Sequence, residues 1–308
     1  MATLTPVAEP TSAPDDPTPP QRKAPLSVRV PMHVSRLSWY LLCAVLAVSM
    51  IFPLVWMLSI ALKGDSDINQ LPPDLIPKQF IWSNFIEGPK QINFLGLLGN
   101  TVTITVLCTI GSVLSSMLVG YGLARVDFAG RKLWFYLFTC SIFLPGIVGI
   151  IPLVRLYIAI HLYDSWWPLI LPAFLGNPVF TFLARQYFQT IPYSIDEAAT
   201  IDGAGHWKIF TRIMFPLTKP LWITMAVMSF QGAWNDYLSP LIYLTTDSKY
   251  PLSLGMAQFS GSFAGVAVTP YNYYMATNFW YMLPPLVLFF LAQRYFMTGL
   301  GSLGGGIK

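Results

Sequence analysis

Six long apolar stretches constrain the fold of this 308-residue chain more than any other feature of its sequence. A membrane-crossing helix needs about 20 apolar residues, because each residue advances about 1.5 Å through about 30 Å of hydrocarbon. Lipid cannot satisfy backbone N–H and C=O groups, and the stretches lack the alternation of barrel strands, so each one predicts a helix. We therefore predict an all-α, polytopic membrane protein with spans near Ser38–Leu62, Leu97–Ala124, Leu133–Leu153, Trp166–Leu183, Leu221–Leu244 and Tyr273–Leu291.

The lysines and arginines indicate the orientation, because positively charged loop residues stay in the cytoplasm. With the N-terminus inside, 13 of the 18 fall in cytoplasmic segments, and only Lys63, Lys78, Lys90, Arg155 and Lys249 lie outside. Both termini are therefore predicted to be cytoplasmic. The net charge of +4 follows from this topology and gives no reason to expect a nucleic-acid partner.

The first 37 residues differ in composition from the rest of the chain. They contain eight prolines and few large apolar side chains. Such a segment cannot bury enough apolar surface to fold, so we predict a disordered cytoplasmic tail over residues 1–37 and a transmembrane domain over residues 38–308.

Motifs for catalysis, metal binding and nucleotide binding are missing from the sequence. The three cysteines and three histidines show no metal-ligand spacing, and no glycine-rich phosphate loop or nucleophile with a base is present. We predict a chain that is not an enzyme and binds no cofactor. If ATP is used, another chain must bind it.

A polar segment at residues 192–220, called the E-A-A segment below, interrupts the apolar spans. Ser194 and Glu197 fit a capping box, which predicts a helix from about Ile195 to the turn at Asp202 and Gly203. Ile195, Ala198 and Ala199 would form a small apolar face that a partner could approach closely.

A second helix is predicted at about His206 to Phe215. Trp207, Phe210 and Met214 would share its apolar side, with Lys208 and Arg212 on a polar side. The two helices form a helix-turn-helix at the cytoplasmic surface. The spacing alone also fits an amphipathic loop that rests on lipid headgroups.

The residue identities favour a partner protein. Glu197-Ala198-Ala199 and Asp202-Gly203-Ala204, with Ile213 and Pro216 behind them, closely resemble the E-A-A signature of the membrane-spanning subunits of ABC importers. The resemblance extends to Gly120–Arg125 and Trp234–Tyr237, and it is strongest to the carbohydrate permeases of the maltose permease small subunit type. Only the proline-rich leader lies outside it.

This resemblance implies a six-helix permease subunit of an ATP-driven sugar importer in a bacterial or archaeal plasma membrane. The implied partners are a second permease subunit, expected to be a different chain, a dimer of ATP-binding subunits that uses ATP and Mg, and an extracytoplasmic sugar-binding protein. The residues that would couple to the ATP-binding subunit are Glu197, Ala198, Ala199, Asp202, Gly203 and Ala204. Related permeases carry glycerol phosphate or other polyols, which is the alternative substrate class.

A polar cluster in the fifth predicted span is the candidate substrate pathway. It consists of Trp234, Asn235, Asp236 and Tyr237, and Asp236 is the only acidic residue well inside a predicted span. The cluster either contacts the solute or forms hydrogen bonds that hold the helices together, and the sequence leaves both open. One such carboxylate, without a detectable inverted repeat, makes a secondary transporter a weak alternative.

Overall fold

The structure is a computed structural model that describes residues 32–68, 70, 72, 74–261 and 270–304, with side chains described from residue 36 to residue 294. Most of the predicted proline-rich tail therefore lies outside the described residues. The chain divides into two compact units, Met1–Phe52 and Pro53–Lys308, and each is described by itself.

The described residues form helices and contain no strand, which confirms the predicted all-α class. Four helical stretches are long and apolar enough to cross a membrane: Arg36–Ala61, Phe94–Arg125, Trp167–Thr190 and Tyr271–Arg294. Two bent pairs of helices bring the number to six when each pair is counted as one span. These pairs are Arg131–Ser141 with Gly146–Ala159 and His206–Leu217 with Lys219–Trp234.

Helix α1 (Met32–Ala61) begins earlier than the predicted span at Ser38. It crosses the boundary between the two units, since the first unit ends at Phe52. All described side chains of the first unit are exposed, and most are apolar.

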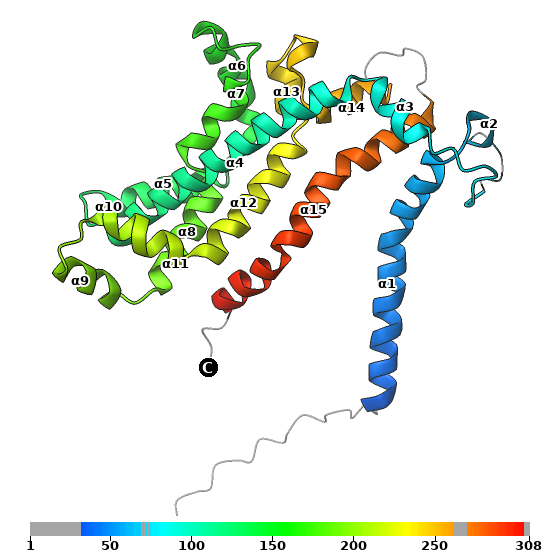
Figure 1. Ribbon diagram of the computed structural model, residues 1–308. Coiled ribbons are helices and arrows are strands. Elements are labelled where there is room, and N and C mark those ends of the chain that lie inside the picture. Colours follow the sequence, from blue (N-terminus) through cyan, green and yellow to red (C-terminus); the bar gives the residue numbers. More distant parts are fainter. Residues whose placement is uncertain (1–31, 69, 71, 73, 262–269, 305–308) are drawn as a thin grey trace, which may run out of the picture. The chain divides into compact units, whose positions relative to one another are not determined.

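The core of the second unit is built around helix α4 (Phe94–Arg125). Helices α8 (Pro178–Thr190) and α12 (Lys219–Trp234) both pack along it, and α15 (Tyr271–Gly304) packs on α12 (Figure 1). The side of α4 that faces these helices carries small or polar buried residues: Thr101, Thr105, Cys108, Ser112, Ser116 and Gly120. Small residues let membrane helices approach closely, and hydroxyls can bond across them.

Gly120 marks the closest approach of α4 to α8. A Cβ atom at this position would lie 2.6 Å from the Cβ of Ala184 and 3.2 Å from the carbonyl oxygen of Thr181. No side chain fits in this space, so the glycine of the Gly120–Arg125 motif sets the distance between the two helices.

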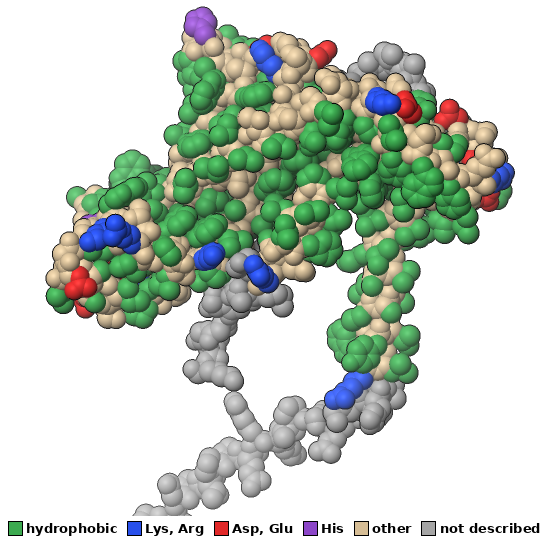
Figure 2. All heavy atoms as spheres, viewed as in Figure 1, with side chains coloured by type: hydrophobic (Ala, Val, Ile, Leu, Met, Phe, Trp, Pro, Cys, Tyr) green, Lys and Arg blue, Asp and Glu red, His purple; other side chains and the backbone are tan. Residues whose placement is uncertain are grey.

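The surface of the bundle agrees with a membrane-spanning protein. Figure 2 shows hydrophobic side chains over the middle of the bundle, while charged side chains gather toward its ends. A lipid-facing belt between two polar ends is what the bilayer requires.

The third predicted span, Leu133–Leu153, is not one straight helix. Helix α5 (Arg131–Ser141) meets the stretch formed by η1 (Gly146–Gly149) and α6 (Ile150–Ala159) at an angle of 97°. Pro145 precedes the bend in an extended conformation. Because proline has no N–H and restricts the residue before it, the first helix must end ahead of this point.

The fifth predicted span, Leu221–Leu244, is also broken. Helix α12 ends at Trp234, and a short helix α13 (Leu238–Tyr243) follows after a three-residue break. The predicted polar cluster therefore lies at a helix end and in a break, not within a continuous helix.

The remaining helices are short, and most of them lie toward the two ends of the bundle (Figure 1), whereas η2 (Leu171–Leu175) packs beside Gly111 and Ser115 in the middle of α4. Those of the E-A-A segment lie where α4 ends, and α13 and α14 lie toward the opposite end. Their bounds are α2 (Asp65–Ile68), α3 (Asn84–Lys90), α7 (Trp167–Ile170), η2 (Leu171–Leu175), α9 (Ser194–Ile201), α10 (His206–Ile209), η3 (Phe210–Met214), α11 (Phe215–Leu217), η4 (Asp247–Lys249) and α14 (Leu252–Phe259).

Candidate functional site

Helix α9 forms where the sequence predicts it, but its capping box does not form. The helix begins at Ser194. Its N-cap residue is Tyr193, whose side chain makes no hydrogen bond to the first turn. Ser194 is thus inside the first turn, one position too late for its hydroxyl to act as the cap. Glu197 is exposed and makes no cap bond.

The end of α9 is a complete glycine cap, as the sequence predicts. Gly203 has φ +76°, its N–H donates to the Thr200 carbonyl over 3.0 Å, and the N–H of Ala204 donates to the Ala199 carbonyl over 2.9 Å. These two bonds are those of the Schellman motif, which needs a residue in the left-handed region at this position. Gly203 fixes the angle between α9 and the helix that follows.

The small apolar face predicted on α9 does not point outward as a whole. Ala199 is buried against the core of its own bundle, and Ile195 and Ala204 pack partly against the same core. Only Ala198 of the predicted face is exposed. The expectation that Ala199 lies open to a partner is wrong for this structure, because α9 uses that face to sit on the bundle.

The outward surface of the E-A-A segment combines charged and large apolar side chains. Glu197, Ala198, Asp202 and Gly203 are exposed, and so are Ile201 at 86% and Trp207 at 67%. Exposed apolar groups rimmed by polar ones are typical of a protein interface. Sequence reasoning missed Ile201, which only the helix geometry shows to be on the outside.

The second helix extends from His206 to Leu217, slightly beyond the predicted His206–Phe215, and contains the π-helical turn η3. Pro216 accounts for this turn, since proline cannot donate to the carbonyl four residues earlier and its ring pushes that carbonyl away. Phe210 and Met214 are buried as predicted, whereas Trp207 points outward.

Arg125, the last residue of α4, joins the E-A-A segment to the bundle. Its side chain is 1% exposed, and its Nη1 donates to the Oδ2 of Asp196 over 2.6 Å. Its Nη2 donates to the carbonyls of Phe188 and Ile191, at the end of α8. The guanidinium also lies 4.2 Å from the ring centre of Tyr193, whose hydroxyl donates to the Ala124 carbonyl.

Partial burial raises the pKa of the Asp196 carboxyl, and the positive charge of Arg125 opposes this shift. Asp196 was not among the predicted site residues, although it directly precedes Glu197. A carboxylate at this position gives no signal by itself, because its partner is 71 residues away in the sequence.

Trp234 of the predicted polar cluster is a core residue. It is 1% exposed, stacks on Phe230 and Tyr281 at ring distances of 5.3 and 6.0 Å, and donates its Nε1–H to the Tyr281 carbonyl over 3.2 Å. The Tyr281 hydroxyl lies within hydrogen-bond distance of two acceptors, the Trp234 carbonyl at 3.2 Å and the Oδ1 of Asn235 at 3.1 Å. These contacts join α12 to α15.

Asp236 also has a local structural role. Its Oδ1 accepts from the Ser239 N–H over 3.1 Å, which starts α13, and its carbonyl accepts from the Ser253 hydroxyl over 2.7 Å. Asp236 and Thr105 are among the residues that line a cavity of about 20 Å³, which has room for about one water molecule. These contacts match the hydrogen-bonding alternative that the sequence left open.

At the opposite end of the bundle, Asp164 organises the connection that follows α13. Its carboxylate accepts from the N–H groups of Thr245 and Thr246, from the Thr246 hydroxyl and from Lys249 Nζ over 2.6 to 3.0 Å. These bonds, led by that of Lys249, hold the pKa of Asp164 well below its usual range. This connection is ordered by specific contacts.

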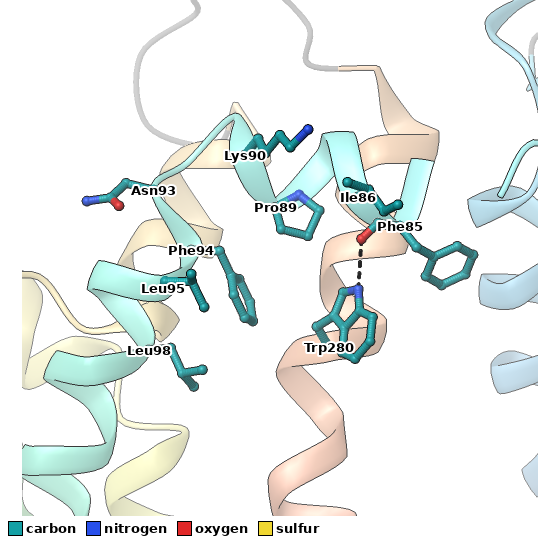
Figure 3. A pocket seen from close by; sticks show the side chains of 9 residues that line it. All are labelled: Phe85, Ile86, Pro89, Lys90, Asn93, Phe94, Leu95, Leu98 and Trp280. Atoms are coloured by element: carbon teal, nitrogen blue, oxygen red, sulfur yellow. Dashed lines mark hydrogen bonds between the residues drawn. The ribbon is translucent and has the colours of Figure 1, made fainter. Parts of the chain in front are cut away.

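One large pocket contains none of the predicted site residues. It has a volume of about 660 Å³ and lies between α3, α4 and α15 (Figure 3). Lys90 and Asn93 are the polar side chains of an otherwise apolar lining, and Trp280 closes one side by donating to the Phe85 carbonyl over 2.9 Å. The pocket lacks the converging polar groups of a binding site for a hydrophilic solute.

Comparison of the sequence with known protein families finds a match. The family described as "Binding-protein-dependent transport system inner membrane component" matches residues 112–302, a range that includes the E-A-A segment and the Trp234–Tyr237 cluster.

Three known proteins are similar over most of their length. The arabinooligosaccharides transport system permease protein AraQ of Bacillus subtilis is 31% identical and covers 89% of this chain and 96% of its own. The inner membrane ABC transporter permease protein YcjP of Escherichia coli is 30% identical, covering 89% and 97%. The sn-glycerol-3-phosphate transport system permease protein UgpE of Yersinia pestis is 33% identical, covering 81% and 90%.

A solved structure has the same fold. The crystal structure of a bacterial ABC transporter involved in the import of the acidic polysaccharide alginate contains a chain that matches with a TM-score of 0.76. The match covers 89% of this chain and 100% of that chain at 21% identity.

Proposed function

Because this chain belongs to the family of binding-protein-dependent transport system inner membrane components, we propose that it forms part of an ATP-driven sugar import pathway and is moved by a separate ATP-binding subunit. The E-A-A segment would be the docking site. The observation that carries this proposal is the outward surface of that segment, where Ile201 and Trp207 are exposed beside Glu197 and Asp202.

The proposed assembly contains a second permease subunit, expected to be a different chain, a dimer of ATP-binding subunits that uses ATP and Mg, and an extracytoplasmic sugar-binding protein. The E-A-A segment and both termini would lie in the cytoplasm. The concentration of lysine and arginine in the segments assigned to that side supports this orientation.

If the E-A-A segment is the docking site, a charged side chain in place of Ile201 should strongly weaken binding of the ATP-binding subunit. Ile201→Glu is expected to weaken retention of the ATP-binding subunit roughly 30-fold, because losing a central apolar anchor costs about 2 kcal/mol or more. Ile201→Leu keeps an apolar side chain and should bind normally. Co-purification of the ATP-binding subunit with the tagged full chain measures both, and undiminished retention by Ile201→Glu would contradict docking through this surface.

A neutral sugar is the proposed solute, and glycerol phosphate is the alternative suggested by the similarity to UgpE. Support for a sugar comes from the similarity to AraQ, an arabinooligosaccharides transport system permease protein, over 89% of this chain.

Uptake measurements separate the two solute classes. Cells with and without the gene are offered labelled arabino-oligosaccharides and labelled sn-glycerol 3-phosphate in parallel. We expect loss of the gene to abolish uptake of the oligosaccharide and to leave uptake of the phosphate unchanged. Dependence of the phosphate uptake alone would assign the chain to the other class.

A further inference from the structure

The contacts of Arg125 divide into a group that is internal to the bundle and one that reaches the E-A-A segment. The internal group consists of the Phe188 and Ile191 carbonyls. These lie at the C-terminal end of α8, where the helix dipole favours a cation. They keep the guanidinium at the junction of α4 and α8 whether or not a carboxylate is present.

The bond to Asp196 is the ion pair that ties this junction to α9, and the Tyr193 ring and hydroxyl meet Arg125 and the Ala124 carbonyl at the start of the same helix. The bond to Asp196 is 2.6 Å long, and the Asp196 side chain is 17% exposed, so water screens the pair only weakly. Among the described residues, Asp196 is the only carboxylate within ion-pair distance of Arg125.

Beyond these contacts of Tyr193, which precedes α9, the contacts of α9 itself with the bundle are less directional. Ala199 and Ile195 pack against the core through apolar surfaces. Apolar contacts are not directional, so they hold the helix on the bundle without fixing its angle. A charge-assisted hydrogen bond does fix an angle, because it requires the donor and acceptor to be aligned.

We propose that Arg125 and Asp196 are positioning residues that fix α9 to the end of α4. Movement of α9 would then be passed to the second membrane span as a rigid-body movement instead of being lost in a hinge. This inference rests on the proposed function, since the ATP-binding subunit is what would move α9. The residues of the docking surface make the contact with that subunit, whereas this pair passes the movement on.

The test measures the distance between α9 and α4 in the assembled transporter. Spin labels are placed at Thr200 on α9 and Leu118 on α4, both exposed, in a full chain whose three native cysteines are replaced. Distances are recorded without nucleotide and after trapping with Mg-ATP and vanadate. With Asp196 intact we expect one narrow distance that is the same in both states.

Asp196→Asn is expected to broaden this distance and to shift it on trapping, while the ATP-binding subunit co-purifies as before. Asp196→Glu keeps the charge and should retain the narrow distance. Asp127→Asn is the matched control, because the Asp127–Arg131 pair is 2.7 Å apart, against 2.6 Å for Asp196–Arg125, but its side chains are 95% and 30% exposed. Its distance should match that of the unsubstituted chain.

A narrow and nucleotide-independent distance in Asp196→Asn would overturn the inference while leaving the proposed function intact. Loss of co-purification in Asp196→Asn would also overturn it, because Asp196 would then belong to the docking surface. An equal broadening in Asp127→Asn would show a general effect of charge and would overturn it as well. Failure of the unsubstituted chain to retain any ATP-binding subunit would instead contradict the proposed function.

Discussion

Gly203→Pro is expected to reduce solute uptake and stimulated ATP hydrolysis to background while leaving the amount of chain in the membrane unchanged. Gly203 has φ +76°, whereas proline is held near −65°. The substitution also removes the N–H that donates to the Thr200 carbonyl. Forcing proline into this position costs ~3 kcal/mol or more, so the Schellman cap opens and α9 loses its set angle to α10.

Gly205→Pro is the matched control for this variant. Gly205 has φ −77° and ψ 165°, which proline adopts without strain, and a Cβ atom there would meet nothing within 4 Å. We expect uptake near that of the unsubstituted chain. Normal uptake and normal stimulated hydrolysis in Gly203→Pro would rule out a coupling role for the turn.

Trp234→Ala is expected to lower the free energy of unfolding by about 3–5 kcal/mol, the cost of emptying a large buried site. The indole fills the contact between α12 and α15, stacks on Phe230 and Tyr281, and bonds to the Tyr281 carbonyl. Thermal unfolding of the purified chain in detergent measures the loss. A decrease below about 1 kcal/mol would contradict a core role.

Two controls separate stability from a role in the solute pathway. Trp207→Ala removes the same side chain from an exposed position and should change the free energy of unfolding by less than about 0.5 kcal/mol. Asp236→Asn keeps the oxygen that accepts from the Ser239 N–H, so it should unfold like the unsubstituted chain. If its half-saturating solute concentration is also unchanged, Asp236 does not belong to the pathway.

The long spans and the turn of the E-A-A segment could be predicted from the sequence because their causes are local. Apolar length requires membrane helices, and a glycine after a short helix allows a left-handed cap. The capping box failed for a local reason too, since helix α9 starts at Ser194 and leaves no place for the hydroxyl to act as the cap.

The bends were harder to predict. Proline within a membrane helix is compatible with a continuous helix, as at Pro284 and Pro285 inside α15, and with a sharp break, as at Pro145. The choice depends on whether neighbouring helices satisfy the freed backbone groups, and this information is not in the segment itself.

The sequence by itself determined the all-α membrane class, the location of the E-A-A segment and its left-handed turn at Gly203, because length, composition and backbone preference act over a few residues. The tertiary structure alone decided which side chains face outward and which contacts join distant segments. It turns Ala199 inward and Ile201 outward, buries Trp234 against α15, and brings Arg125 to Asp196. The direction in which each of these side chains faces depends on where α4, α8, α12 and α15 meet. No periodicity within one segment contains that information.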